Sequence, residues 1–174
     1  NNLKFADQAF SQIATMISRA RELALLAAMA FGAEVSFEEI YSEGIRGLTP
    51  LDFEMASEFG YSVKLLGIAK CRSSSAGDQL EARVHPTLIP QSSLLASVDG
   101  AMNAVAVHGD AVGPTVYYGA GAGELPTASA VVADLMEVAR ELRRGNSGRV
   151  APLSTPHSEL RRLPLVPVHE IRGR

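Results

Sequence analysis

The spacing of apolar residues changes at Gly60, and this change limits the fold more than any other feature of the sequence. Before Gly60, apolar residues recur at the three- and four-residue intervals of amphipathic helices. After it, residues 61–70 and 79–88 alternate between apolar and polar positions, as strands do. The segment 71–78 between them is polar and turn-rich, so we expect a hairpin. The order predicts an α+β fold: helices followed by a mixed, mostly antiparallel sheet packed on helices.

The part before Gly60 predicts three helices. The first covers residues 5–31 and ends at Gly32, a natural helix stop. Its expected apolar stripe comprises Ile13, Ile17, Leu23, Leu26 and Met29. Residues 36–39 resemble a capping box and predict a short helix that ends near Gly44. Thr49 and Pro50 supply an N-cap and a first helical residue for the third helix.

The rest of the chain predicts two short strands and one long helix. The strands cover residues 104–108 and 115–118, and the helix covers 127–144. The apolar residues expected to face inward on this helix are Val131, Val132, Leu135 and Val138. Prolines recur from position 146 onward, which is typical of an extended tail or a linker. We therefore expect one domain over residues 1–145 and a proline-rich tail or linker over 146–174, leading towards a domain that is absent here; the family resemblance given below implies that this domain is regulatory.

Composition excludes several classes of protein. The 174 residues carry a net charge of −3 with no basic stripe, which argues against nucleic acid as a partner. No apolar run approaches the roughly 20 residues that span a bilayer, so no membrane association is expected. The single cysteine, Cys71, cannot form an internal disulfide, which indicates a reducing, cytoplasmic compartment. The four histidines are scattered, and we expect no metal site.

Three glycines, Gly119, Gly121 and Gly123, lie between an apolar strand and an apolar helix. A strand, a glycine-rich loop and a helix can present backbone N–H groups to an anion or a cofactor. The spacing G-x-G-x-G departs from the dinucleotide fingerprint G-x-G-x-x-G, however. Spacing alone favours a tight structural turn and leaves a loop that touches a ligand as the alternative.

Lys64 lies within an apolar strand pattern and has two interpretations. A buried lysine with a lowered pKa can act as a base. A lysine whose stem packs while its head reaches solvent is commoner, and we favour that interpretation.

Two stretches carry a specific resemblance: VDGAMNAV at 98–105 and YYGAGAGELPTASAVVADL at 117–135. With LALLAAMAFG at 23–32, they resemble the catalytic domain of bacterial homoserine dehydrogenases. The resemblance implies NAD(P)-dependent interconversion of L-homoserine and L-aspartate 4-semialdehyde, in threonine, methionine and isoleucine biosynthesis. It also implies a cytoplasmic homodimer and a glycine loop that closes over the cofactor. Gly123 matches the cofactor-contacting position, with Gly121 and Gly119 beside it.

The chain departs from this family pattern in its first part. No strand followed by G-x-G-x-x-G is present, the acidic substrate-binding segment is not found, and residues 1–17 match poorly. In the register set by 23–32, the family's lysine falls on Glu22 and its aspartate on Ser18. We therefore assign no catalytic residue and expect this chain to be an inactive part of a larger enzyme. The alternative is a non-catalytic dimerisation or interaction module derived from the same fold.

Overall fold

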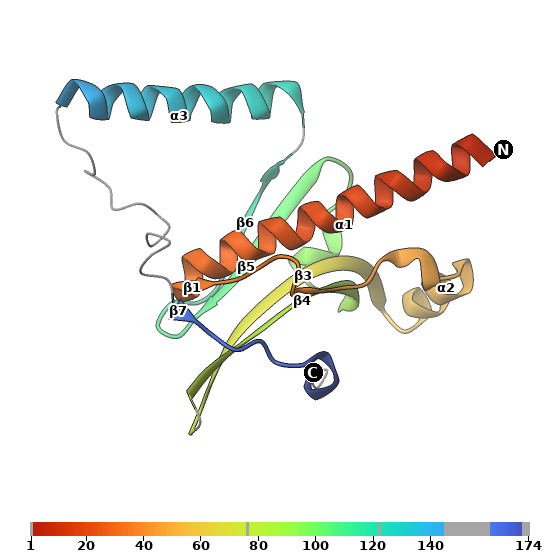
Figure 1. The fold of residues 1–174 in the computed structure, drawn as a ribbon. Helices are drawn as coiled ribbons and strands as arrows, with labels where there is room; N and C mark the ends of the chain where they lie inside the picture. The colour runs from red at the N-terminus through yellow and green to blue at the C-terminus, as the bar shows by residue number, and fades with distance from the viewer. Residues whose placement is uncertain (1, 76, 122, 145–160, 172–174) are drawn as a thin grey trace.

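The computed structural model describes residues 2–75, 77–121, 123–144 and 161–171, and it confirms the expected α+β class (Figure 1). The helices are α1 (Asn2–Phe31), α2 (Pro50–Glu58) and α3 (Glu124–Arg144), with 3-10 turns η1 (Ile45–Gly47), η2 (Leu94–Ser97) and η3 (Val168–Glu170). The strands are β1 (Ala33–Glu34), β2 (Tyr41–Ser42), β3 (Tyr61–Ser74), β4 (Gly77–Pro90), β5 (Met102–Gly109), β6 (Gly113–Ala120) and β7 (Arg161–Arg162).

The strands form one three-stranded sheet and two smaller pairs. The sheet has the order β2–β4–β3, in which β3 and β4 are antiparallel from Tyr61↔Pro90 to Ser74↔Gly77 and β2 runs parallel to β4. β5 and β6 form a second antiparallel hairpin, and β1 pairs in parallel with β7. The predicted mixed, mostly antiparallel pairing is therefore confirmed, as is the first hairpin. Its strands continue through most of the expected 71–78 link.

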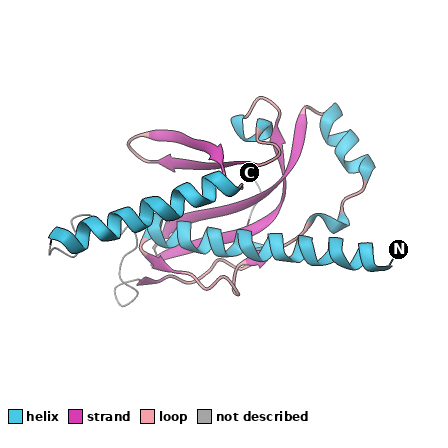
Figure 2. Cartoon of the chain, turned by 90° about the horizontal axis from the view of Figure 1, so that it is seen from above, coloured by secondary structure: helices cyan, strands magenta, loops and turns pink. Residues whose placement is uncertain are grey.

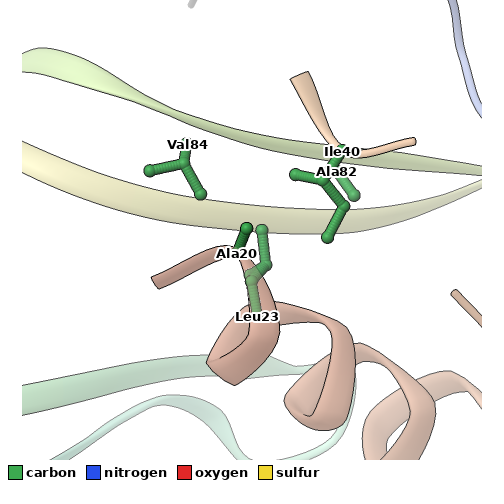
Figure 3. Close-up of a cluster of buried hydrophobic side chains, with 5 residues drawn as sticks. All are labelled: Ala20, Leu23, Ile40, Ala82 and Val84. Atoms are coloured by element: carbon green, nitrogen blue, oxygen red, sulfur yellow. The ribbon is translucent and has the colours of Figure 1, made fainter. Parts of the chain in front are cut away.

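The core lies where α1 packs on the sheet. Ala20, Leu23, Ile40, Ala82 and Val84 form one cluster of buried side chains (Figure 3). The views of the ribbon in Figures 1 and 2 both place α1 over the long strands. Leu23 is only 5% exposed, and burying such a side chain contributes about 1.5–3 kcal/mol. A Cβ on Gly67 of β3 would lie 3.4 Å from Leu23 Cδ1, at ordinary van der Waals distance, so Leu23 lies directly over the backbone of β3.

The residues of α1 that are buried in the structure differ from the apolar stripe that the sequence predicts. Among residues 16–31 of α1, Ala20, Leu23 and Ala27 are buried at helical spacing, and Ala20 and Leu23 pack on the sheet. Ile17, Leu26 and Met29 are 39–46% exposed, and the side chain of Ile13 lies outside the described part. Alanine lets the helix lie close to the sheet, and the larger side chains therefore flank the contact rather than fill it.

The prediction of a short helix that ends near Gly44 is wrong. Residues 36–40 form a turn in which Glu39 N–H donates to the Ser36 carbonyl and Ile40 N–H donates to the Phe37 carbonyl. Ile40 is 5% exposed in the core, and β2 follows it directly. Burial of Ile40 and pairing of β2 with β4 outweigh the local helix signal of the capping box.

The prediction that the apolar residues of the 127–144 helix face the core is also wrong. α3 begins at Glu124, and its apolar residues Val131, Val132, Leu135 and Val138 are 53–64% exposed. β6 leads away from the sheet, so α3 stands apart from the core (Figure 1). The helix forms as its sequence predicts, but among the described residues its apolar face has no layer to pack against.

The described end of the proline-rich segment lies against the domain. Arg161 N–H donates to the Gly32 carbonyl, and the backbone of Leu80 bonds both Pro164 and Val166. Val166 is 8% exposed. Residues 161–166 are thus extended, as expected, and they pair with the sheet. The expected linker region 146–160 lies outside the described residues, and the domain division stays a prediction.

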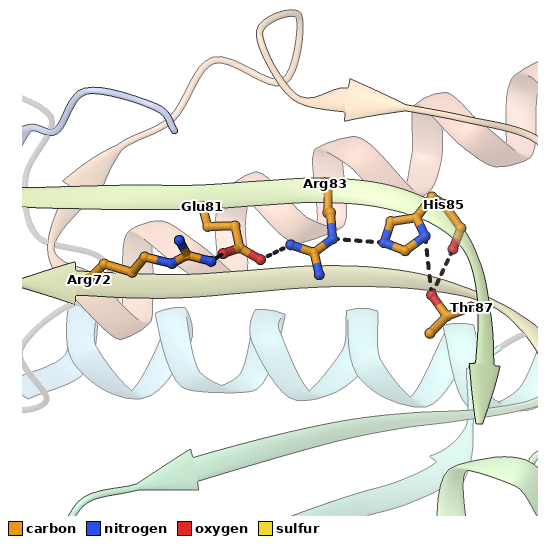
Figure 4. A network of polar contacts seen from close by, with 5 residues as sticks. All are labelled: Arg72, Glu81, Arg83, His85 and Thr87. Atoms are coloured by element: carbon orange, nitrogen blue, oxygen red, sulfur yellow. Dashed lines mark hydrogen bonds and ion pairs between the residues drawn. The ribbon is translucent and has the colours of Figure 1, made fainter. Parts of the chain in front are cut away.

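A polar chain occupies the face of β4 that α1 does not cover (Figure 4). Glu81, 0% exposed, forms ion pairs with Arg72 and Arg83. Arg83 Nε donates to His85 Nε2 at 2.7 Å, and His85 Nδ1 lies 2.8 Å from the Pro86 carbonyl oxygen. Burial lowers the pKa of the Arg83 guanidinium, and the charge of Arg72 lowers it further. Two cations around one buried carboxylate indicate a structural role.

Candidate functional site

The glycine loop is held at the end of the β5–β6 hairpin. Asn103 of β5 is paired with Gly119 of β6. One residue beyond β6, Gly121 N–H donates to the Ala101 carbonyl at 3.3 Å. Gly123 has φ +133°, a conformation that favours glycine, and α3 begins at the next residue. The backbone therefore turns sharply from strand to helix, as the spacing of glycines predicts.

The side chain of Asn103 packs directly on Gly121. A Cβ at Gly121 would collide with Asn103 Nδ2 and would lie 2.7 Å from its Cγ. Arg19 of α1 donates from Nη2 to Asn103 Oδ1 at 3.0 Å. Glycine at 121 thus has a packing reason, and the glycine loop is tied to α1 through one asparagine.

The α1 positions where the chain departs from the family pattern, Ser18 and Glu22, lie beside this contact. Arg19 Nη1 also donates to Glu22 Oε2 at 3.0 Å, and Ser18 Oγ donates to Glu22 Oε1 at 3.1 Å. Both oxygens of Glu22 therefore accept hydrogen bonds, and an ionised carboxylate has no proton to donate. The Arg19 and Glu22 side chains are 40% and 52% exposed, so solvent screens this pair.

The structure brings together two features that the sequence leaves separate. Gly121 is joined to Glu22 and Ser18 through Asn103 and Arg19. Gly119 and Gly123 are exposed, and a Cβ at Gly119 would meet nothing within 4 Å. Sequence reasoning missed Arg19 and Asn103. Asn103 lies in the VDGAMNAV stretch, but no sequence signal shows that its side chain reaches α1.

Lys64 is partly exposed, and its head group is bound by the chain rather than free in solvent. The side chain is 22% exposed, and Nζ donates to the Val98 carbonyl at 2.8 Å and to Asp99 Oδ1 at 2.6 Å. The ammonium group therefore binds the segment that leads into β5.

Two hollows on the described surface lie beside α2 and around Lys64, and the glycine loop lines neither of these two. The larger, about 430 Å³, is an apolar groove between α2 and the β3–β4 hairpin, lined in part by Met55, Phe59 and Leu88. The smaller, about 260 Å³, is polar and lies around Lys64 and Asp99. At the glycine loop itself, the backbone of Gly119 and Gly123 is exposed.

Comparison with known proteins identifies the family. The homoserine dehydrogenase family model matches residues 15–136. A homoserine dehydrogenase of Neisseria gonorrhoeae is 47% identical over 86% of this chain and 34% of its own length. One of Helicobacter pylori is 48% identical over 90% of this chain and 34% of its own. A crystal structure of a homoserine dehydrogenase from Thiobacillus denitrificans has a TM-score of 0.75 at 53% identity, over 85% of this chain and 33% of that one.

These relatives are oxidoreductases, and the matches cover most of the present chain. The chain belongs to the homoserine dehydrogenase family. It spans about a third of the length of the curated relatives that it matches. In the part of the chain that the structure describes, no helix combines the length and apolarity needed to cross a membrane.

Proposed function

We propose that the chain is the catalytic and dimerisation part of a homoserine dehydrogenase. The intact enzyme would interconvert L-homoserine and L-aspartate 4-semialdehyde with NAD(P), in the cytoplasmic route to threonine, methionine and isoleucine. The observation that carries the proposal is the family match over residues 15–136, which includes the glycine loop and the segment that holds it. The domain division at about residue 145 is part of the proposal.

The exposed backbone of the glycine loop fits a cofactor lid. Gly119 has open space where a side chain would be, and Gly123 combines exposure with a backbone conformation that favours glycine. Gly119 and Gly123 would lie against NAD(P) through backbone atoms, with Gly123 as the principal contact. Gly121 supports the loop from within by packing on Asn103. When bound, the nicotinamide accepts or supplies the hydride.

The proton that accompanies this reaction has no donor at position 22. The resemblance places the family's lysine there, but Glu22 is an acceptor already bonded by Ser18 and Arg19. Arginine remains protonated at neutral pH, so Arg19 is a poor proton donor and serves to bind and orient. We therefore expect the 174-residue chain alone to show no NAD(P)-dependent oxidation of homoserine, and a measurable rate would contradict this.

The cofactor role of the loop is tested by a valine at the position of Gly123 in an intact relative such as the Neisseria gonorrhoeae enzyme. Valine disfavours the backbone conformation at φ +133° and adds bulk to the lid. We expect the Kd for NAD(P) to rise about tenfold or more, with alanine at the position of Gly119 as the milder control. Unchanged affinity and unchanged turnover would return the loop to a purely structural turn.

One observation favours a second candidate, a non-catalytic dimerisation module. Glu22, Ser18 and Arg19 satisfy one another as an ordinary surface cluster would. The coding sequence upstream of Asn1 distinguishes the two functions. A nucleotide-binding fingerprint together with the acidic segment supports the enzyme, and a complete open reading frame without them supports the module.

Homodimer formation is supported by the apolar surface of the chain. In the described sheet β3 lies at an edge, and an edge strand is a template for pairing with a second strand. Val107, Val116 and Tyr118 on the β5–β6 hairpin are also 39–58% exposed. Sedimentation of the chain at micromolar concentration should show a dimer, and a monomer alone would count against it.

A further inference from the structure

We propose that Lys64 is a positioning residue for the glycine loop and acts through the turn at residues 98–103. The amino group of Lys64 holds one side of this turn, and the other side holds Gly121. The consequence for cofactor binding rests on the proposed function, whereas the mechanical link itself does not.

The first step is the binding of the turn by the amino group of Lys64. Its Nζ donates to the backbone carbonyl of Val98 at 2.8 Å and to Oδ1 of Asp99 at 2.6 Å. The lysine lies in β3, 34 residues before Val98, so this contact ties the main sheet to the entry of β5. Hydrogen bonds from a charged donor are stronger than neutral ones, and the Val98 bond is part-buried.

The second step is the stiffness of the turn. Met102 N–H donates to the Asp99 carbonyl at 3.2 Å, and Gly100 has φ +63°, which is the geometry of a tight reverse turn. Asp99 and Ala101 are therefore in a fixed relationship. A displacement at the Lys64 end is transmitted to the Ala101 end rather than absorbed.

The third step is the contact between the turn and the glycine loop. The Ala101 carbonyl accepts the Gly121 N–H at 3.3 Å, and the next residues place Asn103 against Gly121. The turn thus contacts Gly121 twice, through a backbone carbonyl and through a side chain. Without Lys64, the turn would lose this direct bond to the main sheet, and Asn103 would keep only its bond to Arg19 of α1.

The exposure of Asp99 and the pairing of β3 with β4 predict that loss of Lys64 has a local effect and does not unfold the chain. The Asp99 side chain is 79% exposed, so its ion pair with Lys64 is screened by water. β3 itself is held by the register with β4 along its whole length and does not depend on the lysine head group. Loss of Lys64 should therefore release the turn and the loop while the hairpin persists.

Amide hydrogen exchange of the chain labelled with ¹⁵N-glycine tests the link, because each glycine is a separate probe. In Lys64→Met we expect the exchange rate of the Gly121 amide to rise about tenfold. The amide of Gly67, in the β3–β4 hairpin, should keep its rate. Lys70→Met is the matched control on the same face of β3, six residues further along, and should leave Gly121 unchanged. Lys64→Arg retains the charge and should restore most of the protection.

Asp99→Asn provides a second variant, because substitution at so exposed a side chain does not threaten the fold. It should raise the Gly121 rate by a smaller factor, about threefold, since the bond to Val98 remains. An unchanged Gly121 rate in Lys64→Met would overturn the proposal. So would equal increases at Gly121 and Gly67, which would reduce Lys64 to general stability. The readout is a loop amide rather than turnover, so failure of the proposed enzymatic function leaves this result intact.

Discussion

Arg19 of α1 donates a hydrogen bond to Asn103 of β5 at 3.0 Å, across 84 residues of sequence. Asn103 in turn packs on Gly121, so one asparagine joins the helix that carries positions 18 and 22 to the loop that carries the glycines. Two segments that are far apart in sequence, the helix with positions 18 and 22 and the glycine loop, are thus joined through a single asparagine. A substitution in α1 near Arg19 should therefore affect the glycine loop, and a substitution in the glycine loop should affect α1.

Gly121→Ala should destabilise the chain by about 1–3 kcal/mol, because an added methyl group overpacks an occupied space. The new Cβ would lie 2.7 Å from Asn103 Cγ and 3.2 Å from Asn103 Cβ, so rotation of the amide alone does not relieve the clash. Gly119→Ala is the matched control, since nothing lies within 4 Å of a Cβ there. Urea unfolding monitored by circular dichroism measures both free energies of unfolding.

Asn103→Ala in the Gly121→Ala background should recover part of this loss, because it removes Cγ and Nδ2, the two atoms that the new methyl group would meet most closely, and leaves Cβ. The two substitutions are therefore expected to be non-additive. Equal destabilisation by Gly121→Ala and Gly119→Ala would show that Asn103 does not fill the space above Gly121.

Glu22→Lys should destabilise the chain by about 0.5 kcal/mol, because it replaces an ion pair with Arg19 by two like charges one helical turn apart. Adding Ser18→Asp supplies a carboxylate four residues before the new lysine, at favourable helical spacing, and should recover most of the loss. Thermal unfolding of the two variants at low salt measures the difference, which should shrink at high salt. Greater stability of Glu22→Lys than of the parent would show that the Arg19 pair contributes nothing.

The elements that the sequence predicts well are those specified by neighbouring residues. Thr49, Pro50 and Gly60 bound α2 as expected, and Gly60 takes φ +76° at its end. The β3–β4 hairpin follows from alternation around one turn-rich segment. In each case the signal and the structure that it specifies lie within a few residues of one another.

The predictions that are wrong concern long-range packing. The segment after Ser36 carries a capping signal, but Ile40 is buried by α1 and β4, which no local pattern reveals. The amphipathic pattern of α3 predicts a helix correctly but not what its apolar face meets. The Arg19–Asn103 bond is likewise invisible to periodicity, because it depends on how β5 is placed beside α1.

Glu81→Leu should destabilise the chain by about 3–5 kcal/mol, because it leaves the part-buried guanidinium of Arg83 without its counter-charge. Arg72→Met should cost much less, since Arg72 is 41% exposed and Glu81 keeps its pair with Arg83. Adding Arg83→Met to Glu81→Leu should recover stability, as replacing both partners of a buried pair often does. Chemical denaturation of the four proteins gives the comparison. Equal effects of Glu81→Leu and Arg72→Met would contradict a buried charge centred on Glu81.

Asp52→Asn should weaken the start of α2 at neutral pH but not in strong acid. The backbone N–H of Thr49 donates to Asp52 Oδ2 at 2.6 Å and its hydroxyl donates at 2.8 Å, and these bonds lower the pKa of the carboxyl. A folded-state pKa below the unfolded value of about 3.9 means that the ionised form stabilises the fold above that pH. The contribution is then lost as the pH falls through the lowered folded-state pKa.

The difference in melting temperature between the parent and Asp52→Asn should therefore be present at pH 7, shrink below about pH 4 and be smallest near pH 2. Thr49→Val removes only the hydroxyl donor and keeps the larger influence of the backbone N–H, so its pH-dependent loss should be smaller. A difference between parent and Asp52→Asn that stays constant from pH 7 to pH 2 would show that the Thr49 bonds do not favour the ionised carboxylate.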